Sequence, residues 1–184
     1  MSVFQIIIFC SLSIIAVIAS RKILLHFERH GFYRFFAWEF IIVLIVFNYK
    51  EWYSNVFSIN QIFSWIFLLY SLFLVLSGLI TLRKMGNVDE TRNDRTLYKL
   101  EKTTELVSSG IYKYIRHPIY GSLIFLAWGV LLKQITLFLI IVALLSTIFL
   151  VITAKFDEKE CTEYFGEEYK NYMLRTKLFV PFIL

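Results

Sequence analysis

The side chains best suited to chemistry gather in one short run, GIYKYIRHPIYG, at residues 110–121. Within it, Arg116 and His117 stand directly before Pro118. Proline fits the first turn of a helix, where its missing N–H is not needed, and it keeps the preceding residue out of the helical region. We therefore expect Arg116 and His117 at the N-terminus of a helix, where two side chains, free backbone N–H groups and the helix dipole favour an anion.

The same run also admits a simpler interpretation as a membrane anchor. Tyrosine rings prefer the depth of the lipid headgroups, and an arginine can extend its side chain to a lipid phosphate. This interpretation explains Tyr112, Tyr114 and Tyr120 as well as a binding role does. It explains the Arg-His-Pro sequence less well, because an anchor has no need of a His-Pro step.

A second polar region follows the last apolar segment, at residues 155–184. Its spacing predicts a helix that continues from that segment. Gly166 lies in the middle of this helix, where glycine costs on the order of 1 kcal/mol relative to alanine, so we expect a close contact or a bend there. Steps of three and four residues place five side chains on one face: Glu158, Cys161, Phe165, Tyr169 and Tyr172.

Apolar segments of nearly membrane-spanning length must position these two regions. The 184 residues are 58% hydrophobic and only 18% charged, which is typical of an integral membrane protein. We predict an all-α, polytopic membrane protein with about five transmembrane helices. The segments are 3–20, 35–49, 62–82, 118–132 and 135–154, and the last two form a helical hairpin around Lys133 and Gln134.

Two residues inside these segments are unusual for a hydrocarbon environment. Glu39, in the second segment, is either part of a functional site or a partner for a neighbouring helix. Gly78, in the third segment, favours close packing between helices.

The distribution of charge predicts how the chain is oriented. Lys and Arg residues concentrate in the connections 21–34 and 83–116. The positive-inside rule then places the N-terminus outside, and the C-terminus and the active site in the cytoplasm. The net charge of +5 follows from the same bias and does not indicate nucleic-acid binding. We expect one integral-membrane domain over residues 1–184, with three spans in 1–82, a cytoplasmic connector in 83–117, the hairpin in 118–154 and a cytoplasmic helix and tail in 155–184.

Several parts of the sequence give no sign of other functions. The two cysteines fall on opposite sides of the predicted membrane and suggest neither a disulfide nor a metal site. The middle of the connector, residues 96–107, could form a short surface helix. Nothing in the sequence indicates an oligomeric state.

The two polar regions resemble the isoprenylcysteine carboxyl methyltransferase family and its relatives, the membrane phospholipid and small-thiol methyltransferases. The first family motif is matched by Gly110, Tyr112, Arg116, His117, Pro118 and Tyr120. The second is matched by Asp157, Glu158, Phe165, Gly166, Glu168, Tyr169 and Tyr172, and the closing RTKLFVPFIL by Arg175 and Pro181. Asp157 stands where the family usually has Glu.

The resemblance implies methyl transfer from S-adenosylmethionine, held between the hairpin and the C-terminal helix. Arg116 and His117 would bind its anionic end, and Glu158 an ammonium or hydroxyl group. Catalytic roles would fall to Arg175, holding a substrate carboxylate, and to Glu168, orienting Arg175 or accepting a proton. The cofactor-binding set is Tyr112, Tyr114, Arg116, His117, Pro118, Tyr120, Glu158 and Tyr169, the tyrosines lining the adenosine pocket or facing the sulfonium.

The resemblance leaves the methyl acceptor open. An isoprenylcysteine-like carboxylate is the first expectation, and a phospholipid amine or a small thiol are alternatives. An NADPH-dependent reductase of the sterol-reductase type and a non-enzymatic membrane scaffold are further alternatives. The expected partners are the lipid bilayer and a lipophilic or small-molecule acceptor.

Overall fold

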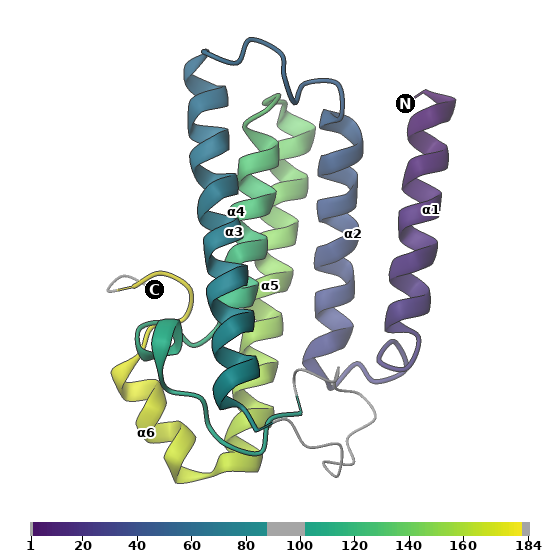
Figure 1. Ribbon diagram of the computed structural model, residues 1–184. Helices are drawn as coiled ribbons and strands as arrows, with labels where there is room; N and C mark the ends of the chain where they lie inside the picture. Colours follow the sequence, from purple (N-terminus) through teal and green to yellow (C-terminus); the bar gives the residue numbers. More distant parts are fainter. Residues whose placement is uncertain (1, 88–101, 182–184) are drawn as a thin grey trace.

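Five helices run alternately up and down through the computed structural model, which describes residues 2–87 and 102–181 (Figure 1). They are α1 (Val3–Ser20), α2 (His30–Asn48), α3 (Ile59–Met85), α4 (Pro118–Leu131) and α5 (Leu137–Phe165). A short 3₁₀-helix, η2 (Gly110–Lys113), precedes α4, and α6 (Glu167–Arg175) follows α5. The prediction of an all-α fold with about five spans and a C-terminal hairpin is confirmed.

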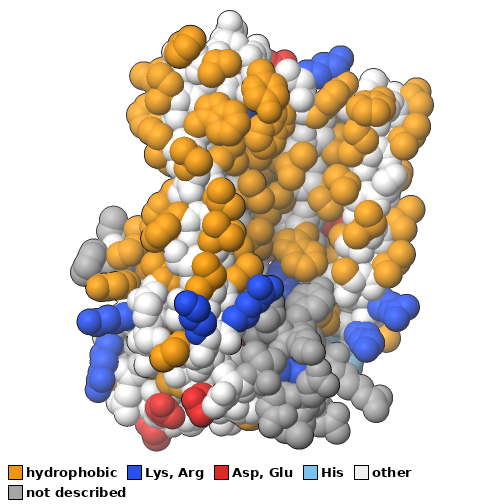
Figure 2. Space-filling view, in the orientation of Figure 1, with side chains coloured by type: hydrophobic (Ala, Val, Ile, Leu, Met, Phe, Trp, Pro, Cys, Tyr) orange, Lys and Arg blue, Asp and Glu red, His pale blue; other side chains and the backbone are white. Residues whose placement is uncertain are grey.

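The lengths of these helices and their outer faces fit a bilayer. α1, α2, α3 and α5 are long and apolar enough to cross a membrane, whereas α4 has 14 residues and is shorter than a full span. Hydrophobic side chains cover the visible sides of the bundle, and charged side chains gather toward the end that carries α6 (Figure 2). The chain is therefore an integral membrane protein.

Some predicted boundaries differ from the observed ones. The second span was expected to begin at residue 35, but α2 begins at His30, so Arg34 lies inside the helix. α3 extends to Met85, three residues past the expected end. Within the connector, residues 102–107 are not helical, and the rest of the helix expected at 96–107 lies outside the described residues.

Small side chains hold α3 and α4 together. Ser64, Ser71 and Gly78 of α3 are spaced by seven residues, about two helical turns, and therefore share one face. The Ser64 hydroxyl donates to the carbonyl of Gly129 at 2.6 Å, and the Ser71 hydroxyl donates to that of Ser122 at 2.7 Å. A Cβ atom at Gly78 would lie 3.2 Å from the proline that begins α4. The prediction that Gly78 serves close packing is confirmed, and this contact fixes the start of α4.

Two charged side chains in or near the bilayer are used for packing. Glu39 of α2 accepts a hydrogen bond from the Ser13 hydroxyl of α1 at 2.6 Å, in agreement with the helix-pairing interpretation. Lys133 lies at the hairpin tip, as expected, and is only 6% exposed. Its ammonium group donates to the Gln61 side chain at 2.9 Å and lies 3.9 Å from the ring centre of Trp65. The tip of the hairpin is thereby attached to the start of α3.

A sharp break separates α5 from α6. Gly166 has φ +62° and ψ −134°, a conformation that side-chain-bearing residues rarely adopt. A Cβ atom placed there would meet nothing within 4 Å, so the glycine is required by the bend and not by a close contact. The tail is therefore two helices, so of the two alternatives expected at Gly166 the bend is confirmed and the close contact is not.

Gly166→Ala should lower stability although no neighbour obstructs the new methyl group. The expected loss is about 1–3 kcal/mol, because the positive φ is strained for alanine. The thermal unfolding midpoint of the purified protein in detergent measures it. Glu167→Ala, at the next and exposed position, is the control and should change stability by less than about 0.5 kcal/mol. Equal midpoints for the wild type and Gly166→Ala would contradict the strained bend.

Candidate active site

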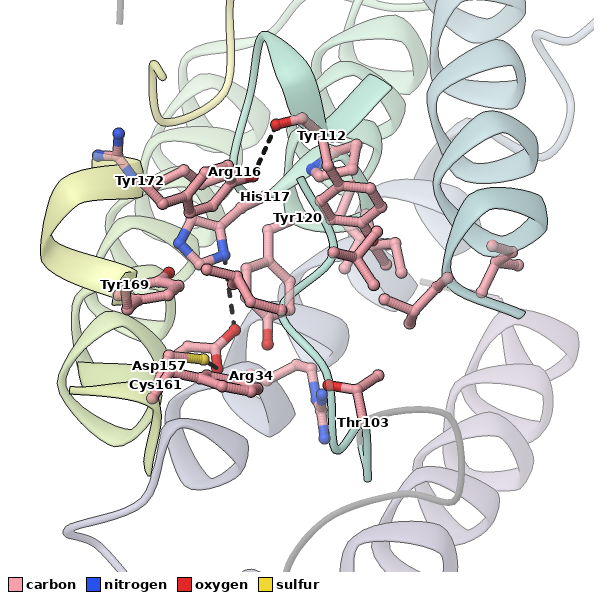
Figure 3. Close-up of a pocket in the computed structure, with 18 of the residues that line it drawn as sticks. Arg34, Thr103, Tyr112, Arg116, His117, Tyr120, Asp157, Cys161, Tyr169 and Tyr172 are labelled. Atoms are coloured by element: carbon pink, nitrogen blue, oxygen red, sulfur yellow. Dashed lines mark hydrogen bonds and ion pairs between the residues drawn. The ribbon is translucent and has the colours of Figure 1, made fainter. Parts of the chain in front are cut away.

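A cavity of about 400 Å³ lies at the α6 end of the bundle (Figure 3). Residues from α2, α3, α4, α5, α6 and the connector line it. Six of its lining residues were predicted from the sequence as cofactor-binding: Tyr112, Arg116, His117, Pro118, Tyr120 and Tyr169. The hairpin and the C-terminal helix therefore bring the two sequence motifs together around one cavity.

The other predicted site residues lie outside this lining. Tyr114 is 47% exposed, and Glu158 is buried beside Arg116. Glu168 and Arg175 are exposed on α6. The catalytic roles predicted for Glu168 and Arg175 therefore gain no support from the geometry and stay predictions.

The predicted face of the C-terminal helix is largely the one that lines the cavity. Cys161 of α5 and Tyr172 of α6 lie on the cavity wall together with Phe165 and Tyr169. The fifth expected member is replaced by its neighbour, because Asp157 lines the cavity and Glu158 does not. One residue along a helix turns the side chain by about 100°, and that rotation separates the roles of the two acids.

Arg34 and Trp38 of α2 line the cavity and were missed in the sequence. Arg34 is 4% exposed, and its guanidinium carbon lies 5.4 Å from the centre of the Trp38 ring. Arg34 was counted with a connection because the apolar pattern seemed to start at Phe35. The detectable signal was an Arg and a Trp four residues apart, which places them on one face of a helix.

Arg116 braces the site from within the protein. Its Nε donates to Glu158 Oε1 at 2.7 Å, and both side chains are about nine-tenths buried. Its Nη1 donates to the carbonyls of Met173, at 3.2 Å, and of Thr176. The last carbonyls of a helix lack partners within it, so Arg116 caps α6 while it is paired with α5.

The backbone before α4 is also occupied by the protein. Ile115 and Lys177 form a parallel β-bridge. The N–H of Arg116 donates to the carbonyl of Lys177 at 2.8 Å, and the N–H of His117 to that of Leu178 at 3.1 Å. These two N–H groups and Nε of Arg116 thus have partners within the protein, so the anion clamp predicted from Arg116 and free backbone N–H groups gains no support from them and stays a prediction.

His117 lies buried between Tyr120 and two carboxylates. It is 6% exposed, stacks on the Tyr120 ring at 5.4 Å, and its Nδ1 lies 3.5 Å from Asp157 Oδ2. Its Nε2 is buried without a hydrogen bond and lies 3.9 Å from Glu158 Oε1. Burial alone would lower the pKa of His117, but hydrogen bonding and charge from Asp157 and Glu158 outweigh it and raise the pKa above 6.5. The charged imidazolium, with an N–H to offer, is thereby favoured.

The tyrosines around the cavity are neutral ring faces and donors. The Tyr172 hydroxyl donates to the carbonyl of Tyr112 at 2.7 Å and fixes η2 against α6. Burial raises the pKa of Tyr112, Tyr169 and Tyr172 above the ordinary value of a phenol. These rings therefore stay un-ionised, and they can stack on a flat ring or face a cation.

The Arg116–Glu158 ion pair should give a measurable interaction energy in a double-mutant cycle. Arg116→Gln and Glu158→Gln should each lower the unfolding free energy by at most about 3–5 kcal/mol, because each removes one side of a largely buried ion pair while Glu158 keeps Lys155 and His117 nearby. The double variant should lose less than the sum, by roughly 0.5–3 kcal/mol. Reversible denaturation in mixed micelles measures the cycle. The exposed Lys170–Glu167 pair is the matched control and should show at most about 1 kcal/mol; additive losses at Arg116 and Glu158 would refute the brace.

Known proteins match mainly the segment that builds this site. The phospholipid methyltransferase family matches residues 59–168, from the start of α3 to the start of α6. The methanethiol S-methyltransferase of Pseudomonas deceptionensis is 34% identical over 71 residues, 39% of this chain and 26% of that protein. The enzyme of the same name from Crocosphaera subtropica is 29% identical over 72 residues, 39% of this chain and 28% of its own.

A third relative is the methanethiol S-methyltransferase 1 of Bradyrhizobium diazoefficiens, 30% identical over 71 residues, 39% of this chain and 24% of that protein. The matched segment thus spans about a quarter of the length of these curated relatives. No solved structure gives a significant match. Because the family match covers more than half of the 184 residues and includes the hairpin and Asp157, the chain belongs to the phospholipid methyltransferase family.

Proposed function

We propose that this protein is a membrane methyltransferase that uses S-adenosylmethionine and methylates a small thiol. The observation that carries the proposal is the cavity at the start of α4, which joins both sequence motifs and lies largely within the segment matched by the family. Its volume of about 400 Å³ falls within the usual range for small-molecule sites, roughly 300–1,000 Å³.

The chemistry of the cavity fits the proposed methyl donor. When bound, S-adenosylmethionine supplies a methyl group activated by a positively charged sulfur. His117 Nε2, a buried N–H that makes no hydrogen bond but lies 3.9 Å from Glu158 Oε1, can donate to the cofactor's carboxylate, while Asp157 can accept from its ammonium group. This pair of opposite charges matches an amino-acid end that is itself zwitterionic. Tyr120 and Tyr169 offer ring faces to the adenine or the sulfonium.

The residues around the cavity hold its walls in place and make much of its lining apolar. Arg116 fixes the end of α6 and the side chain of Glu158, so the walls on α4, α5 and α6 keep their spacing. Leu79 and Leu123 add apolar surface to the lining of the cavity. Rigid positioning is what methyl transfer needs most, because the nucleophile must approach the methyl group in line.

The acceptor is best described as a small thiol. The relatives with matched segments are named methanethiol S-methyltransferases, which favours this alternative over an isoprenylcysteine carboxylate. A cavity at the lower end of the range for ligand sites also favours a small acceptor beside a nucleoside-sized cofactor.

The orientation in the membrane follows from the charge bias, with the α6 end in the cytoplasm. The end that carries α6 also carries the clustered Lys and Arg side chains in Figure 2. A protease added to sealed, right-side-out vesicles should leave a C-terminal epitope tag intact. It should remove the tag after the vesicles are opened. Loss of the tag from sealed vesicles would reverse the orientation.

The activity is tested with purified protein, labelled S-adenosylmethionine and a panel of acceptors. We expect label in methanethiol and other small alkanethiols, and little in a prenylcysteine analogue or phosphatidylethanolamine. His117→Ala should weaken S-adenosylhomocysteine binding by about tenfold, or about 1.4 kcal/mol, in calorimetry. His26→Ala is the control, since His26 lies on the exposed loop before α2.

Other results would select other functions. Label in the prenylcysteine analogue or the phospholipid, with none in thiols, would move the acceptor to a carboxylate or an amine. Binding of NADPH without binding of S-adenosylhomocysteine would favour the reductase. Binding of neither NADPH nor S-adenosylhomocysteine would favour the non-enzymatic membrane scaffold.

A further inference from the structure

Three exposed basic side chains lie together where the chain approaches α4 and where it leaves α6. Lys113 ends η2, and Arg175 and Lys177 stand on either side of Thr176. The N–H of Lys177 donates to the carbonyl of Tyr114, the residue after Lys113, at 2.9 Å. Backbone pairing therefore holds the two segments side by side, and Lys113, Arg175 and Lys177 are called the basic patch below.

The local backbone turns these side chains outward. Thr176 has an extended conformation, with φ −127° and ψ 158°, so its neighbours project to the side opposite its own side chain. Thr176 is 6% exposed and its hydroxyl is hydrogen-bonded within the protein, whereas Arg175 and Lys177 are exposed. Lys113 is likewise exposed beside the buried ring of Tyr112. The basic patch thus lies on the outer surface and not in the cavity lining.

Other lysines near α6 are balanced by carboxylates. Lys159 lies 4.0 Å from Glu163, and Lys170 lies 2.6 Å from Glu167. Among the residues that the structure describes, the three side chains of the basic patch form no such ion pair. An excess of positive charge therefore remains on this surface.

Exposed apolar side chains adjoin the basic patch. Leu174 of α6 is 85% exposed, and Tyr114 is 47% exposed. Directly after Lys177 the chain enters the hydrophobic core, where Leu178 and Phe179 are buried. In Figure 2, Lys and Arg side chains lie along the boundary between the hydrophobic sides of the bundle and its α6 end. Cations beside an aromatic ring and an exposed leucine are typical of a surface at the depth of the lipid headgroups.

We propose that the basic patch binds the phosphate of an anionic phospholipid, whose apolar part lies against Leu174 and Tyr114. Lysine and arginine near a membrane surface are attracted to anionic lipids, and a phosphate accepts hydrogen bonds from several cations at once. A lipid also covers the exposed apolar side chains, which a free phosphate ion does not. The site lies outside the cavity and does not depend on the proposed activity.

A lipid in this position connects the segment before α4 with the segment after α6. On the inner side, the Tyr172 hydroxyl already joins α6 to the carbonyl of Tyr112 in η2 at 2.7 Å. On the outer side, the phosphate bridges Lys113 and Lys177. A ligand that binds the folded protein and not the unfolded chain raises the free energy of unfolding, so anionic lipid stabilises this end of the molecule.

Native mass spectrometry of the full-length protein in nonionic detergent tests the site, with an equimolar mixture of phosphatidylglycerol and phosphatidylcholine. The wild type should retain phosphatidylglycerol in preference to phosphatidylcholine. Each lysine should contribute about fivefold to the affinity, so the double variant Lys113→Gln with Lys177→Gln should bind phosphatidylglycerol roughly 25-fold more weakly. Phosphatidylglycerol should also raise the thermal unfolding midpoint of the wild type more than that of this variant.

Lys159→Gln with Lys170→Gln is the matched control, because it removes the same charge near α6 from lysines that are already paired. It should bind phosphatidylglycerol as the wild type does. Without lipid, both double variants should unfold close to the wild-type midpoint, which excludes misfolding as the cause of a loss. Equal losses in the two double variants, or no preference for phosphatidylglycerol in the wild type, would overturn the proposal. Displacement of the lipid by millimolar inorganic phosphate would also overturn it, since the site would then bind phosphate alone.

Discussion

The site depends on the hydrogen bonds and the ion pair made by the guanidinium of Arg116. A buried arginine must find acceptors inside the protein, and this one finds them on two helices at once: Glu158 of α5 and the last carbonyls of α6. The backbone around it pairs with the tail at Lys177 and Leu178. A single residue shortly before α4, Arg116, therefore holds α6 against the cavity. Arg116 thus joins two helices from within the protein, and His117 stands beside it on the cavity wall.

The membrane-embedded part of the protein supplies a fixed frame for this closure. Small residues let α3 and α4 approach closely, and the contact at Gly78 sets where α4 begins. At the opposite end, Lys133 is attached to Gln61 and lies over Trp65, so the hairpin is held at both ends. A rigid frame of this kind can keep a small cavity open within a bilayer, where unsatisfied polar groups would be costly.

The sequence predicted those features that depend on local pattern. The lengths of the apolar segments gave the helices, Pro118 gave the start of α4, and the three-and-four spacing gave the cavity face at Cys161 and Tyr169. Features that depend on distant parts of the chain were not visible. The partners of Arg116 come from more than 40 residues away, and the place of Arg34 on the cavity wall required knowing that α2 begins at His30. Hydropathy blurs such a boundary, because a charged residue in the first turns of a helix looks like part of a loop.

The break at Gly166 has a consequence for how proteins of this shape can diversify. Cys161 lies on the wall formed by α5, and Tyr169 lies on the wall formed by α6. Gly166 alone joins these two helices. Open space surrounds the position where its side chain would be. A small change in the backbone torsions at the joint would alter the distance between the walls while every lining residue stays the same. Evolution could in this way resize the pocket for a different acceptor without replacing its chemistry.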